Sequence, residues 1–435
     1  MSVQVQQNCG SITSAIADEA YDHGDKPPDQ MELITCLRLF DARYLDQMEQ
    51  SLSVLCFMLY QETEPCLLAP ELSDSIFHFA SHSAVSCNSS LMYLISCIMH
   101  KLSTLPAGLD HLCLLDSFPR LLLHLLATSH THHILNFAIL SMHNLFVRKP
   151  YACDYFRNPQ CIHYLLRHIQ SECPKFLLVL LDCLFMLMHK DEEMTILFVQ
   201  IGGIPCLFAA LCSEDNKVTL KILTMLRSLL ATYPQTKEQM LACDSALDIL
   251  LYLLKNEEFT GTVLVLLSLL SDQLISLEMG QLMEIADQCV EEMRRNEWPR
   301  LLAALRILAN LSCDNAKFKV LLLKNSVPFR LIQLMDGSSD DALLEAAFRI
   351  LFHLTNVPLP EPDLLPTAFG LDGEGISQVK ERLHLVSSSL ASRGAELVSY
   401  WLATALNLSR LIEGVDQHLA QALLSQLFGI SPHLQ

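Results

Sequence analysis

Glycine and proline are scarce in this chain of 435 residues, with 14 glycines and 18 prolines, so it lacks the turn-forming residues that a protein of many short strands needs. Charge is sparse too, since charged residues make up 18% of the chain against a usual share of about 25%. Hydrophobic residues reach 51%, and leucine alone contributes 87 residues. This composition excludes intrinsic disorder for most of the chain and favours a helical fold with a large core.

Basic residues are few relative to acidic ones. There are 29 lysines and arginines against 48 aspartates and glutamates, which gives a formal net charge of -19. Nonspecific nucleic-acid binders gain affinity when lysine and arginine patches release phosphate counterions. We therefore expect no direct nucleic-acid binding, although a local cationic strip on one face is compatible with the overall charge.

No apolar run reaches the roughly 18 residues that a membrane span requires, because Asp182 and Ser268 interrupt the longest ones. Residues 1–20 also lack the basic and apolar regions of a signal peptide. These features predict an intracellular protein that does not insert into membranes. The sixteen cysteines include no CxxC pair, and most lie in apolar stretches, so they are expected to be reduced core thiols.

Motifs of catalysis and of nucleotide binding are missing as well, including GxSxG, GxxxxGK[ST], HExxH and the kinase signatures, so we predict no enzyme. The densest histidine cluster comprises His124, His130, His132 and His133. No cysteine or carboxylate lies at ligand spacing in this cluster, whereas a structural zinc site needs four ligands. It is interpreted as a polar turn between helices, and neither a metal nor another cofactor is expected.

A long amphipathic segment recurs through the chain and ends each time around a central leucine. These marker leucines are Leu102, Leu145, Leu187, Leu229, Leu270, Leu311, Leu354 and Leu408. Six of the seven spacings between them lie within one residue of 42, which is the period of armadillo and HEAT repeats. The last spacing is 54 residues and includes a segment rich in proline and glycine at 357–375.

One period, at 191–231, shows three helices in order. A short helix is followed by Gly202 and Gly203, a second short helix, a polar turn at 213–216 and a longer third helix. Glycine permits the positive φ of a sharp turn, and Ser213 or Asp215 can cap the third helix. We therefore predict an all-α armadillo-repeat fold, a right-handed superhelical solenoid of about eight repeats whose third helices line one groove.

The domain organisation follows from the same pattern. We expect a flexible N-terminal segment at 1–30, armadillo repeats at 31–356, a loop insertion at 357–375, and further repeats with a cap at 376–435.

Four stretches resemble the armadillo domain of the β-catenin and plakoglobin family: NFAILSMHNL (136–145), KFLLVLLDCLFML (175–187), ILFVQIGGIPCL (196–207) and ANLSCDNAKFK (309–319). In that family, groove asparagines bind the backbone of an extended peptide, and basic residues pair with its acidic side chains. The resemblance implies that these roles fall to Asn144, Asn310 and Asn407 for the backbone, Lys319 for an acidic side chain, and His143, His189 and His353 as groove histidines. Several positions that are basic in the family are neutral here: Thr195, Ser268, Phe352 and Leu406.

Each of these residues also has a simpler structural interpretation. The asparagines could cap or cross-link neighbouring helices, Lys319 could be a solvated surface lysine, and the histidines could be core residues. The pattern alone leaves both alternatives open.

The resemblance implies a noncatalytic scaffold for extended acidic peptides, acting in cell adhesion, in Wnt signalling as a transcription coactivator, or in both. The expected partners are cadherin cytoplasmic tails, T-cell-factor-like transcription factors and an α-catenin-like adaptor. We expect a monomer in the cytoplasm and nucleus and at cell junctions. An importin-α-like adaptor is the alternative, although the chain has only two tryptophans, Trp298 and Trp401, and neither fits that class's regular tryptophan array. A regulator that clamps a partner enzyme also stays open.

Overall fold

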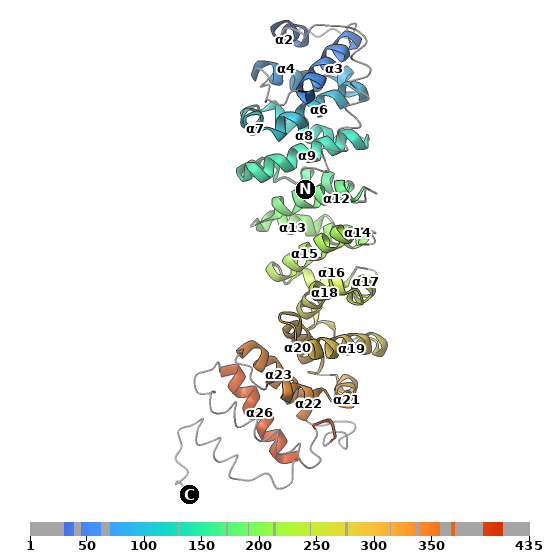
Figure 1. Ribbon diagram of the computed structural model, residues 1–435, viewed down its shortest axis with the longest axis vertical. Helices are drawn as coiled ribbons and strands as arrows, with labels where there is room; N and C mark the ends of the chain where they lie inside the picture. Colours follow the sequence, from blue (N-terminus) through green and yellow to red (C-terminus); the bar gives the residue numbers. More distant parts are fainter. Residues whose placement is uncertain are drawn as a thin grey trace. The chain divides into compact units, whose positions relative to one another are not determined.

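The computed structural model of the chain describes thirteen segments: 30–38, 45–61, 70–128, 131–170, 173–189, 191–211, 215–243, 245–274, 277–313, 315–335, 340–356, 367–369 and 395–411. The regular structure in these segments is helical, and they contain no strand, as the composition predicts (Figure 1). The chain divides into two compact units, 1–222 and 223–435, with the boundary inside one helix. The predicted segment 1–30 lies outside the described residues except for Gln30.

The first unit contains the helices up to that boundary. They are α2 (Gln30–Arg38), α3 (Leu45–Gln61), α4 (Pro70–Ala80), α5 (Ser83–Ser86), α6 (Ser89–Thr104), α7 (Pro106–Leu112), α8 (Ser117–Thr128), α9 (His132–Arg148), the 3-10 helix η2 (Pro150–Ala152), α10 (Cys153–Phe156), α11 (Pro159–Arg167), α12 (Pro174–Met188), α13 (Glu192–Gln200) and α14 (Gly203–Ala210). Helix α15 (Asn216–Thr232) contains the boundary.

The second unit continues with helices of the same kind. They are α16 (Thr236–Leu241), α17 (Ala246–Leu254), α18 (Glu257–Leu270), α19 (Met279–Arg295), α20 (Arg300–Leu311), α21 (Ala316–Lys324), α22 (Val327–Met335), α23 (Asp341–Thr355) and α26 (Ala395–Leu411).

Each marker leucine lies near the end of a long helix, so the predicted register is confirmed. We call these helices the third helices: α6, α9, α12, α15, α18, α20, α23 and α26. The leucines from Leu102 to Leu354 are buried, and none of them is more than 5% exposed. They recur because every repeat must bury its apolar face against its neighbours.

Asparagine and aspartate begin several third helices by capping their free N–H groups. The side chain of Asn88 accepts hydrogen bonds from two amides of α6, and Asp340 accepts one from the Leu343 amide of α23. Asp215 accepts from the Lys217 and Val218 amides at the start of α15, as predicted, whereas Ser213 lies outside the described residues. These short polar side chains set where each third helix starts.

The glycine pair of the 191–231 repeat turns the chain between α13 and α14. Gly202 has φ of 90°, a left-handed conformation that glycine adopts without steric cost. Gly203 is needed for space, because a Cβ atom there would lie 2.4 Å from the ring of Phe198. The two glycines therefore serve different physical purposes, one in the backbone and one in packing.

Among the described residues, one repeat departs from the simple pattern. Ahead of α20, the only helix in 277–299 is the long α19, where other repeats have two short helices. In the predicted loop 357–375, the structure describes only 367–369, where Ala368 and Phe369 are buried. The rest of that loop, all of 376–394 and all of 412–435 lie outside the described residues.

Within each unit, successive third helices pack side by side. In the first unit α6 packs on α9 and α9 on α12, and in the second unit α18, α20, α23 and α26 pack in that order (Figure 1). Equivalent positions on neighbouring repeats therefore lie next to each other. Polar side chains that recur at one position of the repeat form a row across the third helices of a unit. Within the described ranges no single helix is long and apolar enough to cross a membrane, and one pair bent by 71°, α13 with α14, passes that test jointly.

Candidate functional site

The three predicted asparagines all make the same contact. Each directly precedes a marker leucine, and its amide nitrogen donates to a hydroxyl that directly follows the marker leucine of the preceding third helix. The distances are 3.1 Å from Asn144 to Ser103, 2.6 Å from Asn310 to Ser271, and 3.2 Å from Asn407 to Thr355. We call these three pairs the asparagine ladder. It shows that the asparagines cross-link neighbouring helices, one of the two alternatives left open by the sequence.

The hydroxyls of the ladder are themselves fixed. Ser103 donates to the carbonyl of His100 at 2.7 Å, Ser271 to that of Ser268 at 2.8 Å, and Thr355 to that of Leu351 at 2.8 Å. Each hydroxyl donates its proton to a carbonyl of its own helix, so it must act as the acceptor in its hydrogen bond with the asparagine. The amide nitrogen of each asparagine is thereby held against the preceding helix, which leaves its oxygen and one N–H for other partners.

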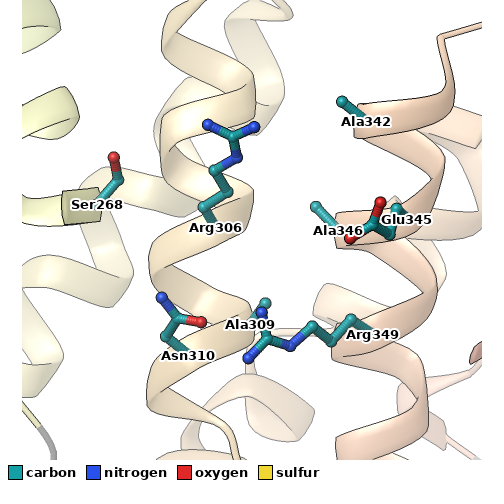
Figure 2. A pocket seen from close by; sticks show the side chains of 8 residues that line it. All are labelled: Ser268, Arg306, Ala309, Asn310, Ala342, Glu345, Ala346 and Arg349. Carbon is teal, nitrogen blue, oxygen red and sulfur yellow. The ribbon is translucent and has the colours of Figure 1, made fainter. Parts of the chain in front are cut away.

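A small pocket lies at the middle pair of the ladder, between α18, α20 and α23 (Figure 2). It has a volume of about 160 Å³ and is lined by Ser268, Arg306, Ala309, Asn310, Ala342, Glu345, Ala346 and Arg349. Figure 2 shows the amide nitrogen of Asn310 on the side of Ser268 and its oxygen on the side of Ala309. The Arg349 side chain extends from α23 toward Ala309, across the space between the two helices.

The charged groups of this pocket are not neutralised by one another. Arg306 is exposed, and Arg349 and Glu345 are half-buried. None of the three forms an ion pair with another residue in the part of the chain that the structure describes. The Nε atom of Arg349 is buried and has no acceptor among those residues. Since a buried donor without an acceptor is costly, this guanidinium is suited to an incoming oxyanion.

The two arginines were missed by sequence reasoning. That reasoning compared the positions two residues before a marker leucine, where Ser268 and Phe352 replace basic residues. Arg306 and Arg349 each lie five residues before a marker leucine, three residues earlier on the helix. Because residues three apart share a helix face, the cations lie one turn away on the same face. A search of every position on that face would have found them.

Lys319 lies on α21, the first helix of its repeat, as the sequence indicates, and its side chain is half-buried. It does not line the pocket that contains Asn310. The two residues were predicted to act together on one peptide, and the structure places them on different elements. The role of Lys319 as a cationic anchor stays a prediction.

His143 belongs to a polar cluster in the first unit. Its ring lies 3.9 Å from a carboxylate oxygen of Asp182, and Asp182 also pairs with Lys221. The ammonium group of Lys221 lies 5.1 Å from the centre of the Phe185 ring. Burial lowers the pKa of His143 below its usual value, and Lys221 adds to this, whereas Asp182 opposes it. The imidazole is therefore mainly neutral at pH 7.

The other two predicted histidines differ in exposure. His189 is exposed at the end of α12, and its backbone carbonyl accepts a hydrogen bond from Arg157 at 3.4 Å. His353 is only 7% exposed, and its ring packs 5.4 Å from that of Phe352. A ligand could therefore contact His189 more readily than His353.

The histidine cluster near residue 130 is spread over two helices, with His124 in α8 and His132 and His133 at the start of α9. His130 lies outside the described residues. Among those described, no three histidines, cysteines or acidic residues are grouped so that they could hold a metal ion. His132 instead packs its ring against Phe176 at 5.2 Å.

Comparisons with known proteins agree with this architecture. No family model matches the chain. Human junction plakoglobin is 26% identical over 262 residues, which cover 60% of this chain and 34% of plakoglobin. Plakoglobin of Xenopus laevis is 23% identical over 261 residues, covering 60% of this chain and 35% of that protein. The chain thus matches about a third of the length of these relatives.

Solved structures share the fold at lower identity. A structure from work on a phosphorylation switch that controls the interaction between cadherin and β-catenin has a TM-score of 0.72 at 17% identity, over 91% of this chain and 75% of that one. An engineered protein has a TM-score of 0.51 at 14% identity, over 92% of this chain and 98% of that one. Together with the 42-residue period and the third helices, these similarities identify the chain as a divergent, β-catenin-like armadillo-repeat protein.

Proposed function

We propose that the chain is a noncatalytic scaffold that binds extended peptides with acidic side chains along its third helices. The observation that carries this proposal is the pocket at Asn310, where a pre-oriented amide lies beside Arg306 and Arg349. An amide can pair with a peptide backbone of any sequence, whereas a guanidinium selects a carboxylate. The combination suits an acidic peptide in an extended conformation.

The spacing of the ladder supports an extended ligand. In the second unit, Asn310 on α20 and Asn407 on α26 lie on either side of α23 in the row of third helices. A peptide that crosses these helices in an extended conformation presents unpaired N–H and C=O groups all along its length. Amide groups that recur from helix to helix provide partners for such a chain without demanding a particular side chain.

Partners of the β-catenin type fit this chemistry. Work on one structural neighbour concerns the interaction of β-catenin with cadherin, and plakoglobin is named for cell junctions. We therefore propose a cadherin cytoplasmic tail as the first partner to test, with T-cell-factor-like transcription factors and an α-catenin-like adaptor as further partners. The corresponding roles are in cell adhesion and Wnt signalling, at junctions, in the cytoplasm and in the nucleus.

The importin-α-like alternative lacks support from the tryptophans. Trp401 is fully buried in α26, so it cannot stack against a ligand, and Trp298 lies between α19 and α20. The cationic pocket would also repel the basic peptides that such adaptors carry. Nothing in the described residues favours this function.

Isothermal titration of the full chain tests the proposal. A cadherin cytoplasmic-tail fragment should bind, and a version with its acidic residues changed to their amides should bind at least tenfold more weakly, a difference of about 1.4 kcal/mol. Binding of the acidic fragment should weaken as salt is raised, because its charges are screened. Tighter binding of a lysine-rich peptide than of the acidic fragment would contradict the proposal and favour the importin-like alternative.

A further inference from the structure

We propose that the pocket between α20 and α23 takes the carboxylate of one acidic side chain of the bound peptide, with Arg306 and Arg349 as its cationic partners. This inference rests on the proposed function and deepens it by assigning a specificity subsite. Neither arginine occupies a position at which the β-catenin resemblance places a basic residue. The subsite is therefore specific to this chain's own third helices.

The size of the pocket suits a single side chain. Sites for small molecules usually enclose about 300 to 1,000 Å³. The pocket at Asn310, at about 160 Å³, is smaller than this range. A short acidic side chain that enters from a backbone lying across the helices needs no larger space.

The charge balance of the pocket also favours one carboxylate. Two guanidiniums and the Glu345 carboxylate sum to one positive charge, which one aspartate or glutamate of the peptide would neutralise. The buried Nε–H of Arg349 lacks an acceptor among the described residues, and a carboxylate beside this guanidinium would provide one. A lysine in the same pocket would face two like charges.

The asparagine ladder sets where the peptide backbone would lie. Asn310 is held by Ser271 through its amide nitrogen, and its oxygen points to the Ala309 side of the pocket (Figure 2). That oxygen can accept a hydrogen bond from a peptide N–H while the adjacent acidic side chain reaches Arg349. The subsite thus contacts both the backbone N–H and the acidic side chain of one residue of the ligand.

Glu345 provides a test that misfolding cannot imitate. It lies one helical turn before Arg349 on α23, and its carboxylate would repel the carboxylate of the ligand. Replacing it by the neutral Glu345→Gln should therefore tighten binding, by about threefold for a half-exposed charge pair. A damaged protein would lose affinity instead.

The experiment is a titration of the full chain with the cadherin-tail fragment and with versions in which each acidic residue is changed singly to its amide. We expect R349Q to weaken binding about tenfold or more and R306Q less, because Arg306 is more exposed. For R349Q, changing one particular acidic residue of the fragment to its amide should no longer alter the binding affinity. The matched control is R294Q on α19, whose side chain is 58% exposed and pairs with Glu291, and which should bind as the unchanged chain does.

The outcomes separate the two proposals. If the unchanged chain binds the acidic fragment but R306Q and R349Q bind it equally well, the subsite is refuted and the scaffold function stands. If R349Q weakens binding no more than R294Q does, the effect is one of overall charge and the subsite is again refuted. If the unchanged chain fails to bind the acidic fragment, the proposed function fails and the subsite fails with it.

Discussion

The hydrogen bond between Ser271 and Asn310 gives a sharp test of the asparagine ladder. Ser271 is fully buried at the end of α18, accepts from Asn310 at 2.6 Å and donates to the carbonyl of Ser268 at 2.8 Å. The change Ser271→Ala removes one oxygen atom and leaves almost the same volume. It therefore deletes the acceptor of Asn310 without opening a sizeable cavity.

The expected loss of stability follows from the energy of one hydrogen bond and from the exposure of Asn310. A hydrogen bond within a protein contributes a net of about 1 kcal/mol to the free energy of unfolding. Asn310 is half-buried, so water can partly replace Ser271 as an acceptor, and we expect a loss of about 1 kcal/mol rather than the larger cost of a fully buried donor. If orienting the Asn310 amide contributes the same amount to binding, the acidic peptide should bind about fivefold more weakly.

A double-mutant cycle measures this coupling. Chemical denaturation of the chain with Ser271→Ala, Asn310→Ala and both changes should give a coupling energy of about 1 kcal/mol, because the residues are in direct contact. Peptide binding should be the same in the double variant as in Asn310→Ala alone, since Ser271 acts on the ligand only through Asn310. Thr355 shows that threonine can hold this position, so Ser271→Thr should retain binding. Additive effects of the two alanine changes on both quantities would refute the ladder as a positioning device.

Three further predictions concern other parts of the chain. Gly203→Ala should destabilise the fold by about 1 to 3 kcal/mol through overpacking against the Phe198 ring, and Phe198→Leu should restore part of the loss of melting temperature. Burial lowers the pKa of His100 to about 4, and Lys101 adds to this, so the unfolded chain binds the proton first as pH falls below about 6.5. Stability should therefore decline between that pH and about pH 4, by about 2 kcal/mol at pH 5, and denaturation of His100→Gln should lack this component. Lys319→Glu combined with Asn310→Ala should weaken acidic-peptide binding about 100-fold or more in calorimetry, less so at high salt, and unchanged affinity would remove Lys319 from the site.

The fold could be predicted from the sequence because the repeat is encoded in residues that must be buried. A leucine every 42 residues at the end of a long apolar segment specifies a helix end that packs on its neighbours, and the structure places the markers at such helix ends. The single helix α19 was not predicted. Its sequence has an apolar period of a helix throughout, with Leu282, Ile285, Cys289 and Met293 on one side, whereas the period at 191–231 has two short helices at this place.

The sequence indicated the asparagines of the ladder but not their hydroxyl partners. The asparagines stood out because asparagine is a poor helix former, but their partners lie 39 to 52 residues earlier in the chain. Ser103, Ser271 and Thr355 each follow a marker leucine directly, so a hydroxyl after one marker and an asparagine before the next is the signal. The hydroxyls alone do not indicate a bond to the next helix, because serine and threonine at helix ends usually bond their own helix, which these residues also do.

One helical position has opposite charge on a third helix of the first unit and on two third helices of the second, and we expect this difference to decide where an acidic ligand binds. Five residues before the marker leucine, α12 has Asp182, whereas α20 and α23 have Arg306 and Arg349. Asp182 is already paired with Lys221 and lies near His143, so its charge is neutralised within the first unit. A carboxylate approaching that cluster would have to displace an existing ion pair, at a cost in Coulomb energy and desolvation. Arg306 and Arg349 have no such partner among the described residues, so we expect the helices around Asn310 to be the ones that select acidic side chains of a ligand.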